Sequence, residues 1–323
     1  MSIKSILTGW TAPSLKAETH VRKFSTTGDI LSYRRCRRAY GYFGVRGFSS
    51  ATATQRYFGT LVHDVLDRIN RGYQQSPSYT LPTQAEVEDL VAEAHDRLIR
   101  SGVRPYNAAQ QQKTAALLIY RFVALIGPKF FPNVRQTEYR LERVLRTHTG
   151  RDYVLDGIVD ILSGAVAHAL ELPYSTSADD IEIWDYKSGR MPKKGSSELR
   201  DYEFQMKVYA ELYHQQTGKY PARAVLVFVG ELGHDERWTL AGGAARRFPD
   251  LFYTVHPNPA DIAAAMNDFH QTVEAIEAER SANYSLQWQA PAHPVDLNTC
   301  EACELRYSCS NFSDGRRQRS EPL

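Results

Sequence analysis

Two residues in the segment "IEIWDYKSG" are of types that do chemistry on charged substrates. Asp185 and Lys187 are two positions apart on an expected strand, so both side chains leave the sheet on the same face. A carboxylate beside an ammonium group could hold a divalent cation and place a positive charge next to it for an anionic substrate. An ordinary surface ion pair has the same spacing, so the pair alone does not identify a site.

The preceding expected strand contributes further acids. Its segment "LDGIVDIL" places Asp156 and Asp160 among apolar residues, where a carboxylate is costly unless a metal or a partner compensates it. Asp160 lies deep in this strand. Asp156 precedes a glycine, and capping a bend in the backbone would be enough to explain it. Glu138 in "TEYRLERV" is a possible additional acid, although an exposed glutamate at a strand edge explains it equally well.

Two expected helices carry polar side chains that could join these acids. His63 lies within the apolar stripe of "GTLVHDVL", a position that a core histidine with a hydrogen-bond partner also occupies. In "FQMKVYAELY", Gln205 and Tyr209 are four residues apart, so both polar ends lie on one helical face. We therefore expect these side chains and the acids to form one polar site, although they come from separate parts of the chain.

The cysteines are a second group of residues with chemical potential. Three of the four lie together near the end of the sequence, in "CEACELRYSC", and Cys36 lies far upstream in "YRRCRR". In a reducing compartment, four cysteines are more often metal ligands, catalytic groups or core residues than disulfides. Four thiolates can close a tetrahedral Zn²⁺ site or hold an iron–sulfur cluster, and chemistry alone does not separate the two. One distant and three clustered cysteines match a zinc ribbon poorly.

Composition limits the class of protein. The 323 residues, 42% of them hydrophobic, can bury one large core or two smaller ones. A formal net charge of +2 excludes a bulk polycation, so nucleic-acid binding would depend on local basic segments such as "YRRCRR", "MPKKGSSELR" and "GRRQRS". Solvated arginines explain each of these segments taken alone. No apolar run reaches the ~18 residues of a membrane span and no signal peptide is recognisable, so we expect a cytoplasmic protein.

Apolar spacing predicts helices in the first part of the chain and a sheet after them. Helical patterns cover 29–43, 56–73, 83–102 and 107–127, and later 199–218 and 259–280. Short runs rich in Val, Ile, Tyr and Leu predict strands over 137–147, 151–164, 181–189, 222–232 and 251–257, with a short one over 237–240. The segment 168–180 is expected to be a strand end followed by a loop. The result is an α/β fold with four or five strands and a helix inserted between two of them.

Four segments in this order resemble motifs of the RecB-type branch of the PD-(D/E)XK nuclease superfamily: "GTLVHDVL", "DGIVDIL", "DYKSG" and "QMKVY". Members of that branch share a helix with a metal-binding histidine, a Gly-x-x-Asp strand, an Asp-x-Lys strand and a Gln-x-x-x-Tyr helix. The resemblance implies a restriction-endonuclease-like core over 133–290, a mixed central sheet flanked by helices. It also implies an N-terminal extension over 1–28, a helical region over 29–132 and a tail over 291–323.

Carried over residue by residue, the resemblance implies a bound Mg²⁺ or Mn²⁺ ion. Its ligands would be His63, Asp160, Asp185 and the backbone carbonyl of Tyr186. Lys187 would be the catalytic lysine, which orients the attacking water or offsets charge on the phosphate. Gln205 and Tyr209 would support the site and contact DNA.

The cysteines resemble those of the iron–sulfur subgroup of these nucleases, which includes the AddB nuclease domain and the CRISPR-associated iron–sulfur exonucleases. In that subgroup an N-terminal Cys-x-Arg helix and a C-terminal Cys-x2-Cys-x5-Cys segment hold a [4Fe-4S] cluster. The resemblance implies the same for Cys36, Cys300, Cys303 and Cys309, with Zn²⁺ as the alternative. Arg37 stands where the family often has proline. The cluster would clasp the helical region to the tail.

As a function, the resemblance implies a metal-dependent deoxyribonuclease, an exonuclease on single strands or DNA ends in recombination, repair or defence against foreign DNA. No Gly-x4-Gly-Lys-Ser/Thr phosphate loop occurs, so any helicase partner would be encoded separately. Three alternatives stay open: a non-catalytic DNA-binding or scaffolding subunit with the same fold, a ribonuclease, and a nuclease with a zinc clasp.

Overall fold

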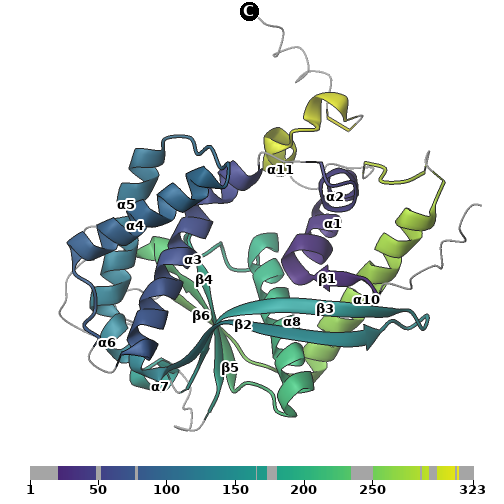
Figure 1. Ribbon diagram of the computed structural model, residues 1–323. Helices are drawn as coiled ribbons and strands as arrows, with labels where there is room; N and C mark the ends of the chain where they lie inside the picture. Colours follow the sequence, from purple (N-terminus) through teal and green to yellow (C-terminus); the bar gives the residue numbers. More distant parts are fainter. Residues whose placement is uncertain are drawn as a thin grey trace, which may run out of the picture.

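A computed structural model describes residues 21–48, 52–76, 79–164, 166–172, 180–233, 250–283, 286–290, 297–309 and 311–312 (Figure 1). The expected short strand over 237–240 and the basic tail segment "GRRQRS" lie outside these residues. Among the described residues no single helix is long and apolar enough to cross a membrane. By length and composition alone, one bent pair, Ala108–Leu125 with Gly127–Asn133 at 55°, passes the same criterion.

The centre of the molecule is a mixed sheet with six strands among the described residues. The strands are β1 Lys23–Ser25, β2 Val134–Arg146, β3 Asp152–Ser163, β4 Glu182–Lys187, β5 Arg223–Phe228 and β6 Phe252–Val255. Their order is β1-β3-β4-β5-β6, and β2 pairs with β3 as an antiparallel hairpin. The sheet has more than the four or five expected strands because β1, with three residues, is too short to show a periodic pattern.

Strand β3 organises the sheet because it has partners along both edges. On one side it pairs with β2 over nearly its whole length. On the other side it pairs with β1 through Val154, Leu155 and Asp156, and with β4 through the segment that begins at Ile161. Strands β4 and β5 run parallel, as expected for two strands joined by the crossover helix α8, Ser197–Thr217.

Helices cover both faces of the sheet and create two hydrophobic cores (Figure 1). One core packs Trp184 and Tyr186 of β4 against α3 Thr52–Gln75, α4 Gln84–Arg100, α5 Ala108–Leu125 and α6 Gly127–Phe130. The other packs Ile183 of β4 against α8 and α10 Pro259–Ser281. Successive residues of β4 therefore face different cores, which is the two-residue period of a strand buried on both faces.

Local signals in the sequence explain where several helices begin and end. Thr83 forms a capping box with Glu86 at the start of α4: its hydroxyl accepts from the Glu86 N–H, and the Glu86 carboxylate accepts from the Thr83 N–H. At the start of α8 the Ser196 hydroxyl accepts a hydrogen bond from the Leu199 N–H, and Gly218 ends that helix with a left-handed φ of 77°. The sequence-based boundaries of these two helices are confirmed to within about two residues.

Two expected elements differ in the structure. The helix expected over 29–43 is divided into η2 Thr26–Leu31, α1 Ser32–Arg35, α2 Arg37–Tyr40 and η3 Gly41–Val45. Cys36 has an extended backbone (φ −162°, ψ 108°) between α1 and α2, a break that apolar spacing does not reveal because the pattern continues across it. The first residues of the segment 168–180, expected to be a strand end, instead belong to the helical turn α7 Val166–Ala169, where the Glu182 carboxylate accepts a hydrogen bond from the Ala167 N–H. Residues 173–179 of this segment lie outside the described residues.

The N-terminal helices pack against residues from the far end of the chain. A Cβ built on Gly41 would lie 2.1 Å from Cγ of Trp288, so the indole rests directly on the glycine backbone. Arg38 donates to the carbonyl of Ser308, six residues after the end of α11 Leu297–Ala302, at 3.1 Å. The two ends of the chain are therefore joined by contacts that involve no cysteine.

Candidate active site

Strands β3 and β4 stop pairing at the position of the two expected acids. Their last register pair is Ile161 with Trp184, and Asp160 and Asp185 are the next residues along each strand. In place of a further strand pair, Asp160 Oδ2 accepts a hydrogen bond of 2.7 Å from the Tyr186 backbone N–H. We call this opening between Asp160 and Asp185 the β3–β4 fork.

Lys187, Asp185 and Gln205 form a compact polar group at the fork. The Lys187 ammonium lies 2.6 Å from Asp185 Oδ2 and donates to Gln205 Oε1 at 2.9 Å. The Gln205 amide in turn donates to Asp185 Oδ1 at 3.3 Å and to the Tyr209 hydroxyl at 3.0 Å. Gln205 and Tyr209 of α8 thus lie next to each other beside the pair on β4. Their four-residue spacing predicted that they share one helical face.

His63 reaches the fork from the opposite side, on helix α3. Its Nδ1 lies 3.3 Å from Asp160 Oδ2, and its ring meets the Tyr186 ring edge to face. Burial disfavours the protonated imidazole, but the carboxylates of Asp160 and Asp185 outweigh burial and raise the pKa of His63 to about 9. At neutral pH His63 therefore forms an ion pair with Asp160.

The two carboxylates at the fork have pKa values shifted in opposite directions. Burial alone would raise the pKa of Asp160, but His63 and the Tyr186 N–H stabilise the anion and lower it below its usual value. Burial and the neighbouring Asp160 charge raise the pKa of Asp185, which is only 3% exposed, against the pull of Lys187. Binding of a cation between these two neighbouring carboxylates would reduce the repulsion between them.

Tyr186 supports the site from the core beneath it. Its ring lies among Phe122 and Phe130 with centroid distances of 5.6 and 6.2 Å, and Asn70 donates to its hydroxyl at 3.3 Å. Burial raises the pKa of this phenol, so the ring stays neutral. The Tyr186 backbone is therefore held rigidly at the fork, where its N–H already binds Asp160.

Glu138 lies near the fork in an unusual backbone conformation. It has a left-handed φ of 47° within β2, which costs a non-glycine residue about 1–3 kcal/mol. Partial burial of its carboxyl group and the charge of Asp160 raise the pKa of Glu138. The structure thus brings Glu138 to the acids of the fork, at the expense of backbone strain.

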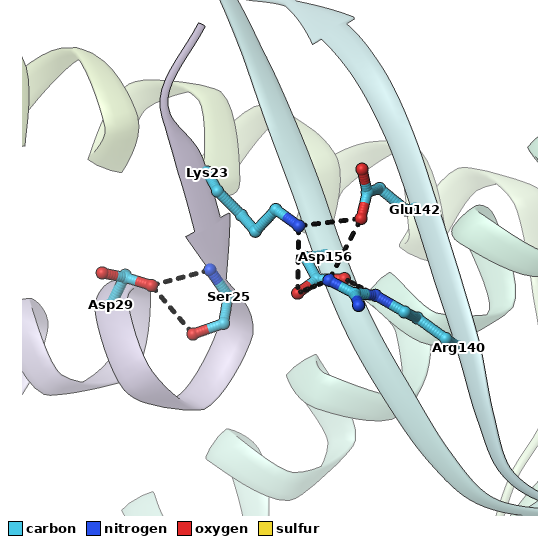
Figure 2. Close-up of polar contacts among 6 residues, drawn as sticks. All are labelled: Lys23, Ser25, Asp29, Arg140, Glu142 and Asp156. Atoms are coloured by element: carbon cyan, nitrogen blue, oxygen red, sulfur yellow. Dashed lines mark hydrogen bonds and ion pairs between the residues drawn. The ribbon is translucent and has the colours of Figure 1, made fainter. Parts of the chain in front are cut away.

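Asp156 has a different environment from Asp160, although both lie on β3. Figure 2 shows Arg140 and Lys23 converging on its carboxylate, with Glu142 beside them. Arg140 binds it through two hydrogen bonds of 2.9 and 3.1 Å, and Lys23 lies 3.7 Å away. Two cations already neutralise Asp156, so it stabilises the β1–β3–β2 surface and lies outside the fork.

Gly157 explains the spacing between β3 and α8. A Cβ at this position would lie 2.8 Å from Tyr209 Cε1 and 3.3 Å from Leu212 Cδ1. Any side chain would push α8 away from the sheet. The glycine therefore lets Tyr209, and with it Gln205, approach the fork.

The cysteines lie at the junction of the chain ends, and all four are partly buried. Successive turns link the C-terminal three: the Cys303 N–H donates to the Cys300 carbonyl, and the Cys309 N–H to Arg306. Burial raises the pKa of the Cys303 thiol, and the neighbouring Cys36 and Cys309 raise it further. Cys36, Cys303 and Cys309 are therefore within electrostatic reach of one another.

Both sets of expected ligands contain donors suited to the metals in question. Two carboxylates and an imidazole suit Mg²⁺ or Mn²⁺, and four thiols suit an iron–sulfur cluster or Zn²⁺. Within the described ranges, however, no group of three or more His, Cys, Asp or Glu side chains is spaced to hold a metal ion. At the fork, Asp160 is paired with His63 and Asp185 with Lys187.

One residue beside the fork was not recognised in the sequence. The Lys187 ammonium lies 4.5 Å from the centre of the Tyr202 ring, a cation–π contact. Tyr202 lies one helical turn before Gln205 on α8 and faces the same way. Tyr202 is three residues before Gln205, a spacing that also places two residues on one helical face, but the sequence does not show that this face meets Lys187.

Comparison with known proteins shows the superfamily of the chain. The chain belongs to the PD-(D/E)XK nuclease superfamily, whose family model matches residues 26–310. Members of this superfamily are typically metal-dependent nucleases. The search of curated proteins found no match. Among solved structures 16 chains match. One of these, titled "Crystal structure of SSO0001", is 15% identical, covers 78% of this chain and 86% of its own, and has a TM-score of 0.34.

Proposed function

We propose that this protein is a Mg²⁺- or Mn²⁺-dependent deoxyribonuclease that hydrolyses phosphodiester bonds at the β3–β4 fork. The observation that carries the proposal is the convergence of His63, Asp160, Asp185 and Lys187 from three separate elements, in a chain of the PD-(D/E)XK superfamily. The proposed metal ligands are His63, Asp160, Asp185 and the backbone carbonyl of Tyr186. A bound divalent ion would supply Lewis-acid activation of the phosphate and of a water molecule.

The remaining groups position the reactants. Lys187 places a positive charge beside Asp185, where it can orient the attacking water or offset charge that develops on the phosphate. Gln205 fixes the position of the Lys187 ammonium relative to the Asp185 carboxylate, since it is hydrogen-bonded to both. Tyr209 supports Gln205 and, in this proposal, the two residues also contact DNA.

We further propose that Cys36, Cys300, Cys303 and Cys309 hold a structural [4Fe-4S] cluster. The electrostatic proximity of Cys36, Cys303 and Cys309 and the bond from Arg38 to Ser308 support this assignment. The substrate would be a single strand or a DNA end, cleaved as an exonuclease. The biological setting would be recombination, repair or defence against foreign DNA, with a separately encoded helicase as a possible partner.

Cleavage of labelled single-stranded DNA tests the nuclease proposal. Purified protein is incubated with Mg²⁺, with Mn²⁺ or with EDTA, using strands labelled at the 5′ or the 3′ end. We expect metal-dependent cleavage that Asp185→Ala and Lys187→Ala each reduce by about 10²–10³-fold, the usual effect of removing one transition-state contact.

Asp156→Ala is the matched control, because Asp156 lies four residues from Asp160 on the same strand but is neutralised by Arg140 and Lys23 (Figure 2). It should cleave at the wild-type rate. A wild-type protein inert with both metals, or an Asp185→Ala protein as active as wild type, would refute the proposal. Iron and sulfide analysis after anaerobic purification tests the cluster, and stoichiometric zinc without iron would replace it by a zinc site.

A further inference from the structure

The arginines around Cys36 differ in what they bind. Three have partners inside the protein: Arg34 donates to Thr272, Arg37 pairs with Glu279, and Arg38 donates to the backbone of Ser308. Arg35 is exposed and, in the part of the chain that the structure describes, its guanidinium makes no hydrogen bond or ion pair. Of the four arginines in this basic segment, Arg35 is therefore the one whose guanidinium has no hydrogen bond or ion pair among the described residues.

The position of Arg35 follows from how α1 docks on α8. The Arg34 guanidinium lies 4.4 Å from the centre of the Phe204 ring, which fixes α1 against the first half of α8. Burial raises the pKa values of Asp201 and Tyr202, and the Arg35 charge opposes both shifts. Arg35 thus lies within electrostatic reach of Tyr202.

Tyr202 connects Arg35 with the fork. One face of its ring covers the Lys187 ammonium at 4.5 Å, and its hydroxyl donates to Glu198 at 3.0 Å. The ring also packs against Phe228 at a centroid distance of 6.0 Å, which holds it in place. Tyr202 therefore contacts Lys187 at the fork, and the Arg34–Phe204 contact two residues further along α8 places the exposed Arg35 on the same side of α8.

We propose that Arg35 binds a phosphate of the substrate strand next to the scissile one, and that Tyr202 is a positioning residue that holds Lys187. This inference rests on the proposed nuclease function and adds the direction in which the strand leaves the fork, across Tyr202 toward α1. A guanidinium suits this task because it binds phosphate oxygens through two parallel hydrogen bonds. Arg35 would break no internal hydrogen bond or ion pair in doing so, and would weaken only its longer-range attraction to Asp201.

Binding of an uncleaved strand tests the role of Arg35. Fluorescence anisotropy with a labelled oligothymidylate in EDTA measures affinity without hydrolysis, at several salt concentrations. We expect Arg35→Ala to weaken binding about tenfold at low salt and to reduce the salt slope by ~0.7, the loss of one phosphate contact on a single strand. In the cleavage assay the same variant should raise KM with kcat unchanged, since Arg35 does not touch the reacting atoms.

Arg143→Ala is the control for loss of one positive charge. Arg143 is exposed on β2 and pairs in register with Leu155, five strand residues or roughly 17 Å from Asp160. It should bind and cleave as wild type does. If Arg35→Ala keeps wild-type affinity and salt slope, the subsite is refuted while the nuclease proposal stands. If wild type binds strands but never cleaves them, the nuclease proposal fails by itself.

Two substitutions at Tyr202 separate its ring from its hydroxyl. Tyr202→Phe keeps the face over Lys187 and should retain kcat, whereas Tyr202→Leu removes it and should lower kcat about tenfold without changing strand affinity. Loss of kcat in Tyr202→Phe equal to that in Tyr202→Leu would show that the bond to Glu198 matters instead, and would overturn the positioning role. Thermal unfolding of both variants controls for general loss of stability.

Discussion

Replacing Gly157 by alanine tests whether close packing of α8 on β3 holds the fork together. The new Cβ would lie 2.8 Å from Tyr209 Cε1 and 3.2 Å from Cδ1. Carbon atoms in contact stay about 3.5–4.0 Å apart, so the Tyr209 ring would have to withdraw by roughly 0.7–1.2 Å. Tyr209 is 6% exposed and its hydroxyl accepts from Gln205, so this movement would also disturb Gln205 and its bond to Lys187.

Two terms set the magnitude of the effect. Overpacking a core contact costs about 1–3 kcal/mol, while alanine in a strand interior is favoured over glycine by about 0.5–1 kcal/mol. The φ angle of Gly157 is not positive, so alanine can adopt the backbone conformation of this residue. We therefore expect a net destabilisation of about 1–2 kcal/mol, together with reduced cleavage because Lys187 loses its fixed position.

Urea unfolding of a double-mutant cycle measures this coupling. Gly157→Ala should lower the free energy of unfolding in the wild-type background. In a Tyr209→Ala background, where the ring has been removed, it should raise the free energy of unfolding by up to about 0.5–1 kcal/mol. The interaction energy should equal the overpacking cost of about 1–3 kcal/mol, within the range found for contacting residues. Equal effects of Gly157→Ala in both backgrounds would refute the packing argument, as would a fully stable and fully active Gly157→Ala protein.

Three further predictions concern other parts of the molecule. Glu138→Gly should be more stable to urea than Glu138→Ala by about 1 kcal/mol, because glycine adopts the left-handed φ without strain; equal stabilities would contradict this strain. Cys303→Ala should lose iron and unfold at lower temperature than wild type, and an iron-loaded variant of unchanged stability would rule out the cluster as a clasp. Burial and His148 lower the pKa of His270, so the unfolded chain binds more protons than the folded one below pH 6.5, and stability should fall as the pH drops below 6.5. His270→Gln should weaken this dependence in thermal unfolding, and an unchanged pH profile would exclude His270 as its source.

Short-range spacing in the sequence predicted the parts of the site that depend on one element. Asp185 and Lys187 face the same way because strand side chains alternate, and Gln205 and Tyr209 meet because residues four apart share a helical face. The choice of Asp160 over Asp156 also followed from local burial. The structure adds the reason, since Arg140 and Lys23 reach Asp156 from other strands.

Features that depend on contacts between distant residues could not be read from spacing. Strand β1 exists because Lys23–Ser25 lies beside β3, and three residues carry no period of their own. The break at Cys36 lies within an unbroken apolar pattern, and the left-handed Glu138 occurs at a residue type that rarely adopts it. The contact of Tyr202 with Lys187 depends on how α8 packs over β4, which spacing within α8 does not give.

The position of β1 has a consequence for synthesis of the protein on the ribosome. Lys23 pairs with Val154, so the first described strand must wait for about 130 further residues before its partner exists. At ~5–20 residues per second this delay is roughly 7–26 seconds. Trp288, which packs on Gly41, emerges later still. The segment from Thr26 to Val45 is thus made well before the residues that it packs against, and during this interval a chaperone could bind it.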